Sequence, residues 1–138
     1  MSAMSDYLEL KFLDHFTGRA STSSPSAVYL GLAVGSIADN AGGTELSGNN
    51  YTRKAITFAV ASGGAISSNA NVEFNPATGS WGTVSHWAIF DASSSHFGIY
   101  DASSSGNLLF HGAFTASKAI ATGDILKVAS GSLTISAN

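Results

Sequence analysis

The side chains of this sequence best suited to acid–base catalysis or metal binding are its four histidines, His15, His86, His96 and His111. No two of them have a recognised metal-binding spacing such as H-E-x-x-H. His86 and His96 occupy equivalent positions of a ten-residue repeat, so their spacing follows from duplication. His111 lies in a strand-like segment where the alternation of residue types predicts an outward-facing side chain. We therefore expect the histidines to be structural, with no metal bound.

Paired carboxylates are the next source of catalytic chemistry, and Asp91 and Asp101 form the clearest pair. Both are copies of one repeat position, and both follow a strand-like segment, where aspartate commonly starts a turn. Glycosidase chemistry would require them to converge across a cleft. The sequence also lacks cysteine, a G-x-S-x-G elbow, a G-x-G-x-x-G loop and a phosphate-binding P-loop. We expect no catalytic residue, no cofactor and no enzymatic activity.

A long polar loop over residues 39–50 contains the side chains best suited to calcium. Carboxylate and amide oxygens are the hard ligands that calcium prefers, but the loop lacks the regular acidic alternation of an EF-hand. We therefore expect a solvated loop without a bound metal. The candidate ligands are Asp39, Asn40, Glu45 and Asn49.

The two tryptophans, Trp81 and Trp87, could form a stacking platform for a sugar. Trp87 shares its predicted strand face with Ile89, which indicates that it is buried. Trp81 follows a Gly-Ser turn, and we expect it to be an exposed contact residue.

Composition excludes two further classes of partner. Charged residues make up only 11% of the chain, and six basic against nine acidic side chains give a net charge of −3. Such a chain cannot follow a phosphate backbone, so we expect no nucleic-acid binding. No apolar run approaches the roughly 20 residues that a membrane-spanning helix needs, and the acidic N-terminal segment does not resemble a signal peptide. A weakly charged surface of serine, alanine and glycine favours assembly with other proteins.

The N-terminal segment has the apolar spacing of a helix. Leu8, Phe12 and Phe16 recur at i, i+4 and i+8, Asp6 can cap the helix, and Gly18 can end it. A glutamate three residues after Asp6 completes the pattern of a capping box. The apolar stripe is expected to dock on a surface, either within its own domain or on a neighbouring subunit.

From residue 21 the chain changes to strand-length runs separated by turn residues. These runs predict an antiparallel β-sandwich or jelly-roll-like domain over 21–138, preceded by a helix and connection over 1–20. Within 51–61, alternation predicts a half-buried strand with Ile56, Phe58 and Val60 on one face and Arg53, Ala55 and Thr57 on the other. The remaining expected strands cover 27–34, 66–74, 81–90, 107–114, 124–128 and 132–136.

A tandem repeat interrupts this pattern. Residues 86–95 read HWAIFDASSS, and residues 96–105 read HFGIYDASSS. Each copy is a short apolar strand followed by a polar turn. We expect one copy in the core sheet and the other in a protruding hairpin, where Phe97 and Tyr100 either pack back on the domain or contact a neighbour.

A series of short motifs runs through the strand-like segments. In order they are AVYLGL at 27–32, GTELSG at 43–48, YTR at 51–53, WGTVSH at 81–86, IFD at 89–91, GNLLF at 106–110 and GSLTI at 131–135. Together they resemble a family of small tailed-bacteriophage virion proteins described as tail-fibre-like. In that family the aspartate turn runs directly into the Gly-Asn-Leu-Leu-Phe strand, so the second repeat copy is a ten-residue insertion.

The resemblance implies a structural protein of the phage particle, on the capsid surface or the tail, that is made in the host cytoplasm. A chain of 138 residues without a coiled coil, collagen-like repeat or β-helix cannot span a receptor-seeking fibre. We therefore expect a decoration or cement protein that stabilises the capsid at subunit junctions. A tail, neck or fibre-associated protein is the alternative, and a host carbohydrate-binding module is a further one.

The implied partners are other virion proteins, namely the major capsid protein or tail proteins, and further copies of the chain in a homo-oligomer, with a trimer favoured. The expected contacts combine the helix stripe, one tryptophan and the repeat tip. The contact residues are Leu8, Phe12, Phe16, Trp81, Phe97 and Tyr100.

Overall fold

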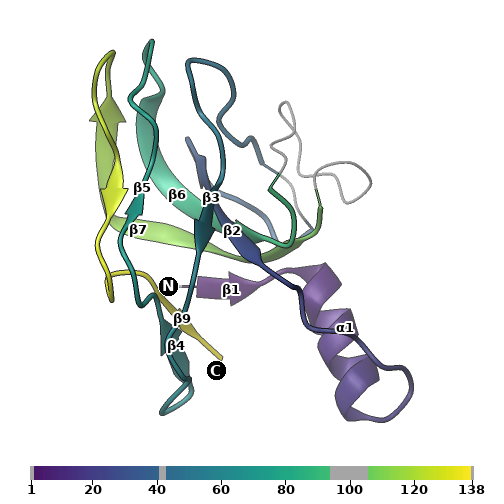
Figure 1. The fold of residues 1–138 in the computed structure, drawn as a ribbon. Coiled ribbons are helices and arrows are strands. Elements are labelled where there is room, and N and C mark those ends of the chain that lie inside the picture. Colours follow the sequence, from purple (N-terminus) through teal and green to yellow (C-terminus); the bar gives the residue numbers. More distant parts are fainter. Residues whose placement is uncertain (1, 41–42, 94–105, 138) are drawn as a thin grey trace.

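The computed structural model describes residues 2–40, 43–93 and 106–137 (Figure 1). This part of the chain is mainly β, with antiparallel sheets and one short N-terminal helix, as the sequence predicted. That helix is neither long nor apolar enough to cross a membrane. The elements are β1 (Ser2–Met4), α1 (Asp6–Phe16), β2 (Val28–Ala33), β3 (Lys54–Ile56), β4 (Ala65–Ser67), β5 (Val72–Glu73), β6 (Gly82–Phe90), β7 (Leu108–Ile120), β8 (Lys127–Val128) and β9 (Thr134–Ser136).

Five strands form the main sheet in the order β1-β7-β6-β2-β3, and every pair is antiparallel. Two small sheets, β4-β9 and β5-β8, lie against one face of it (Figure 1). The register of the β6–β7 pair shifts between Val84 and His86, which face Lys118 and Ala113. The extra residues on β7 form a bulge, which bends the strand.

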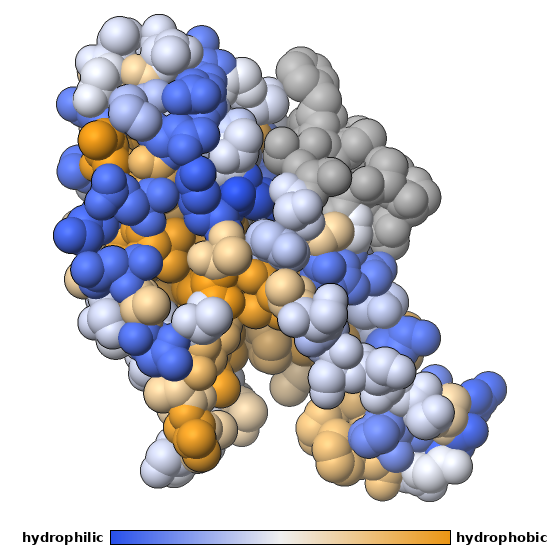
Figure 2. Space-filling model, viewed as in Figure 1, coloured by the Kyte–Doolittle hydropathy of each residue, from blue (hydrophilic) through white to orange (hydrophobic). Residues whose placement is uncertain are grey.

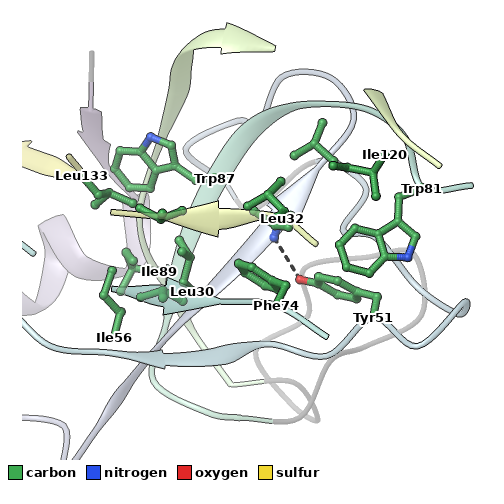
Figure 3. Close-up of a cluster of buried hydrophobic side chains, with 14 of the residues drawn as sticks. Leu30, Leu32, Tyr51, Ile56, Phe74, Trp81, Trp87, Ile89, Ile120 and Leu133 are labelled. Atoms are coloured by element: carbon green, nitrogen blue, oxygen red, sulfur yellow. Dashed lines mark hydrogen bonds between the residues drawn. The ribbon is translucent and has the colours of Figure 1, made fainter. Parts of the chain in front are cut away.

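The core lies between the main sheet and the two small sheets. Four core side chains, Leu30 and Leu32 from β2 and Trp87 and Ile89 from β6, are drawn in Figure 3. They belong to one buried cluster with side chains of the small sheets, such as Ile135. The alternation predicted for residues 66–74 is confirmed at its end, because Val72 and Phe74 are buried while Asn71 and Glu73 are exposed. Trp87 is also buried, as predicted.

The strand predicted over 51–61 is wrong in extent and in its faces. Only Lys54–Ile56 forms a strand. Arg53 is 5% exposed, although alternation placed it opposite the apolar face, and Val60 is 93% exposed, although it was placed on that face. Both differences have a physical cause, since Arg53 has a buried acidic partner and Val60 lies beyond the strand, next to the turn at Gly63.

The helix begins one residue earlier than predicted. Ser5, rather than Asp6, is the N-cap, and its hydroxyl oxygen accepts a hydrogen bond from the backbone nitrogen of Leu8 at 3.2 Å. The sequence also gave no sign of β1, which pairs with β7 through Ser2–Met4. The helix is therefore preceded by a strand of the main sheet.

Candidate functional site

The helix presents an apolar surface that the described residues of the chain leave uncovered. No residue of α1 is buried. Of the predicted contact residues, Leu8 is partly buried against the core, whereas Phe12 and Phe16 are 49% and 73% exposed. Leu10 and Leu13 are also exposed. We call Leu10, Phe12, Leu13 and Phe16 the helix face.

An apolar groove of about 330 Å³ lies beside the helix. Tyr7, Leu8 and Lys11 of α1 form one wall. The opposite wall belongs to the lobe formed by the β4-β9 sheet and the turn before it, residues 57–67 and 134–136, which we call the β4–β9 lobe. Figure 2 shows the helix and this lobe as two projections with a hollow between them. The remaining lining side chains include Val28, Phe58, Ile66, Ile89, Leu109, Phe110 and Ile135.

The start of the helix is held firmly against the sheet. Ser5 is 1% exposed, its hydroxyl donates to the carbonyl oxygen of Leu108, and its backbone nitrogen donates to Leu109 at 2.9 Å. The backbone nitrogen of Asp6 donates to the carbonyl oxygen of Asp39 at 2.8 Å. These contacts fix the helix where it leaves β1, so its exposed face has a defined position.

His111 also takes part in this anchor. Its pairing with Ala88 places it on the side of the sheet away from Ile89 and the main core, as alternation predicted, but it is not exposed there. It is buried, and its Nε2 atom lies 2.7 Å from Oδ1 of Asp39. The loop that contains Asp39 covers this position of β7, which the local alternation could not indicate. The pair links that loop to the sheet beside the helix.

A buried ion pair occupies the loop that offered calcium ligands. Glu45 is 1% exposed, and its Oε2 atom lies 2.7 Å from Nη2 of Arg53. Arg53 Nε donates to the other carboxylate oxygen at 2.8 Å, so the contact is bidentate. The guanidinium carbon of Arg53 lies 3.5 Å from the ring centroid of Phe90, which adds a cation–π contact.

Tyr51 completes this buried cluster. Its hydroxyl donates to Oε1 of Glu45 at 2.7 Å. The same hydroxyl accepts from the backbone nitrogen of Leu32 at 2.9 Å (Figure 3). Burial raises the pKa of Tyr51 well above its ordinary value, and the negative charge of Glu45 adds to this effect. A Cβ atom at Gly31 would lie 2.9 Å from Glu45 Oε1, so the cluster requires glycine there.

The expected solvated loop is therefore wrong at Glu45, whose carboxylate is fully engaged inside the protein. The other candidate ligands do not converge. Asp39 contacts His111, and the side-chain amide of Asn49 donates to the carbonyl oxygen of Ser80 at 3.1 Å. In the described ranges, no three acidic or histidine side chains gather closely enough to hold a metal.

Trp81 is not an exposed contact residue, contrary to the prediction. It is 5% exposed and packs edge-on against the rings of Tyr51 and Phe74. Its indole nitrogen donates to the carbonyl oxygen of Asn49 at 3.0 Å. This arrangement presents no ring face to a sugar.

The first repeat copy lies in the core sheet, where its residues 86–90 belong to β6. The second copy, including His96 and the predicted contacts Phe97 and Tyr100, lies outside the described residues, as does Asp101. The described ends of this loop are joined, because Asp91 accepts hydrogen bonds from Asn107.

Comparison with known proteins identifies one family. A family model described as Podophage GP4 fiber I protein gp80 (Gp80) matches residues 3–95 and again 94–136. The two matched segments meet at the junction between the repeat copies, where the sequence contains its ten-residue insertion. No curated protein matches the chain.

Proposed function

The chain belongs to the Gp80 family of podophage GP4 fiber I proteins, and on this premise we propose that it acts as a non-enzymatic structural component of the phage tail or its fibres. Membership makes it a bacteriophage virion protein of the fibre type, with other virion proteins as its partners. The family description favours a position on the tail or its fibres over capsid decoration. From the sequence alone, the tail or fibre position was only an alternative. The match over 3–95 and 94–136 carries this proposal.

The surface of the molecule supports a role in holding other proteins. Monomeric soluble proteins rarely leave contiguous large apolar patches exposed, and such patches commonly mark interaction sites. The helix face and the adjacent groove form such a region on a rigidly anchored element. The proposed mechanism is burial of apolar area at contacts with neighbours, at about 25 cal/mol per Å².

Host adhesion through a tryptophan platform loses its support, because Trp81 and Trp87 are both buried in the core. An aromatic side chain that binds sugar must expose a ring face. The large exposed aromatic side chains of the described residues, Tyr7, Phe12 and Phe16, all lie on α1.

Labelling of intact particles tests the proposed position. Antibodies raised against the purified chain are bound to virions of the phage that encodes it, and gold-labelled particles are imaged by electron microscopy. Pre-immune serum on the same virions is the control. Label confined to the tail, neck or appendages supports the proposal, whereas label spread over the capsid overturns it in favour of decoration.

A further inference from the structure

The helix face and the groove are two incomplete apolar surfaces on one chain. Of the eight large apolar side chains that are exposed in the described residues, five belong to α1. An 11-residue helix is marginally stable in water unless one face packs on something. Within its own chain, α1 packs little beyond Leu8 against the core.

The helix face points away from the helix's own groove. Tyr7 and Lys11 lie on the side of α1 that lines the groove. With 3.6 residues per turn, Leu13 projects about 160° and Phe16 about 140° around the axis from Lys11. The described part of the chain therefore cannot cover its helix face with its own groove.

We propose that the groove receives α1 of a second copy of this chain, with the helix face packed on the β4–β9 lobe of that copy. In this arrangement the incoming helix lies along the opening of the groove, between the resident helix and the lobe. Its Phe12 and Phe16 side chains enter the groove towards Phe58 and Ile66. A reciprocal or cyclic exchange then covers both unpartnered surfaces in every copy.

The size of the groove fits the aromatic side chains of the helix. Phe12 and Phe16 form a pair with ring centroids 4.8 Å apart. A cavity of about 150 Å³ accommodates one benzene ring. The groove, at about 330 Å³, therefore has room for both rings.

One charged contact is also available to the incoming helix. The helix carries three acidic residues, Asp6, Glu9 and Asp14, and one basic residue, Lys11. The charged groups that line the groove are Lys11 and Asp91, and Asp91 is held by Asn107 through both carboxylate oxygens. Lys11 is thus available at the groove wall for a carboxylate of the incoming helix.

The oligomeric state of the full chain provides the test, and it does not depend on where in the virion the protein lies. Light scattering after size-exclusion chromatography is expected to show a dimer or trimer. The double variant Leu13→Ser/Phe16→Ser is expected to raise the dissociation constant by at least about tenfold, since it removes two large apolar contacts. The matched control, Val34→Ser/Ile125→Ser, removes two exposed apolar residues outside the groove and helix, and should not change the mass.

Cysteine cross-linking tests the groove directly, because the chain contains no cysteine. A Phe16→Cys variant and an Ile66→Cys variant are mixed and oxidised. A disulfide-linked mixed dimer is expected, and an excess of wild-type chain, which offers both surfaces without a cysteine, should reduce its yield. A monomeric wild-type chain, equal effects of the helix-face and control variants, or failure to form the mixed dimer would each overturn the proposal. Capture of a different virion protein by a monomeric chain would likewise assign the groove to another partner.

Discussion

Asp91 and Asn107 close the neck of the loop that contains the second repeat copy. Oδ1 of Asp91 accepts from the backbone nitrogen of Asn107 at 2.6 Å, and Oδ2 accepts from its side-chain nitrogen at 2.8 Å. Arg53 reinforces this neck by donating from Nη1 to the carbonyl oxygen of Ala92 at 3.0 Å. These contacts lie outside residues 94–105. The hydrogen bonds that close the neck therefore do not depend on the length of the insertion.

Deletion of residues 96–105 is therefore expected to leave the fold intact. The deletion shortens the chain between Asp91 and Asn107 about threefold. A shorter loop costs less conformational entropy to close, so the free energy of unfolding should rise by roughly 1 kcal/mol. Urea unfolding followed by circular dichroism measures the change. As a control, Asp91→Ala in the full-length chain should be destabilising, because it removes both acceptors at the neck. A deletion variant that unfolds more readily than the Asp91→Ala variant would show that the second copy belongs to the core.

Loss of one charge from the buried pair of Glu45 and Arg53 is expected to destabilise the fold. Removal of one partner of a buried ion pair leaves an uncompensated buried charge and typically costs about 3–5 kcal/mol. Glu45→Gln should therefore lower the free energy of unfolding by an amount of that order. The matched control is Asp14→Asn, which breaks the exposed contact of Asp14 with Arg19 at 3.8 Å and should cost less than about 1 kcal/mol. Equal decreases in the free energy of unfolding for the two variants would contradict a buried, stabilising ion pair between Glu45 and Arg53.

The raised pKa of Tyr51 predicts that the protein loses stability at alkaline pH. Its pKa is raised in the folded state, so the folded protein retains a proton that the unfolded chain releases above about pH 10. The stabilising contribution is fully present below that value and is lost as pH rises through the folded pKa. Tyr51→Phe should lower stability at neutral pH, because the buried backbone nitrogen of Leu32 loses its acceptor.

The stability difference between wild type and Tyr51→Phe should narrow as the pH rises from about 9 to 11. Urea unfolding across this range measures it, and Tyr7→Phe, which changes an exposed tyrosine, is the control. A difference that stays constant over the range would show that Tyr51 does not titrate with folding.

Local patterns were enough to predict the β-rich fold and the helix. The alternation that ends at Val72 and Phe74, and the helical spacing of Leu8, Phe12 and Phe16, arise from neighbouring residues in the sequence. The helix start was displaced by one residue because Ser5 and Asp6 are both suitable caps. The choice between them depends on pairing of β1 with β7, more than one hundred residues away.

The groove and the buried polar cluster could not be predicted in this way. Alternation placed Arg53 on the polar face of its predicted strand. Only the folded chain brings Glu45 and the carbonyl oxygen of Ala92 to its guanidinium group. Trp81 was placed outside because it follows a turn, yet the loop at Asn49 and the ring of Phe74 enclose it. In each case the environment of the side chain is made by distant segments of the chain.

Both tryptophans are expected to report a buried environment. Trp81 and Trp87 are each 5% exposed, and the chain has no other tryptophan. Intrinsic fluorescence should therefore be blue-shifted and weakly quenched by iodide, and it should shift red on unfolding. Trp81→Ala should cost about 3–5 kcal/mol through the cavity that it leaves. Emission typical of a solvated indole, or a stable Trp81→Ala variant with reduced glycan binding, would revive the adhesion hypothesis.

The N-terminal segment combines a folding role at Ser5 with the exposed helix face. Removal of residues 1–18 is expected to destabilise the fold, because it deletes β1 and the anchor of Ser5 to Leu108 and Leu109. Truncation therefore cannot isolate the contribution of the helix face.

Ser5→Ala separates the two roles, because it removes the cap and leaves the helix face unchanged. It should lower the free energy of unfolding by about 1–2 kcal/mol, since it removes both the cap of the Leu8 nitrogen and the bond to the Leu108 carbonyl. Hydrogen exchange at the first turn of α1 should accelerate in this variant. Ser24→Ala, at an exposed position of the following connection, is the control and should change neither quantity. Unchanged exchange at the first turn of the Ser5→Ala variant would show that the strand pairing of β1 alone holds the helix in place.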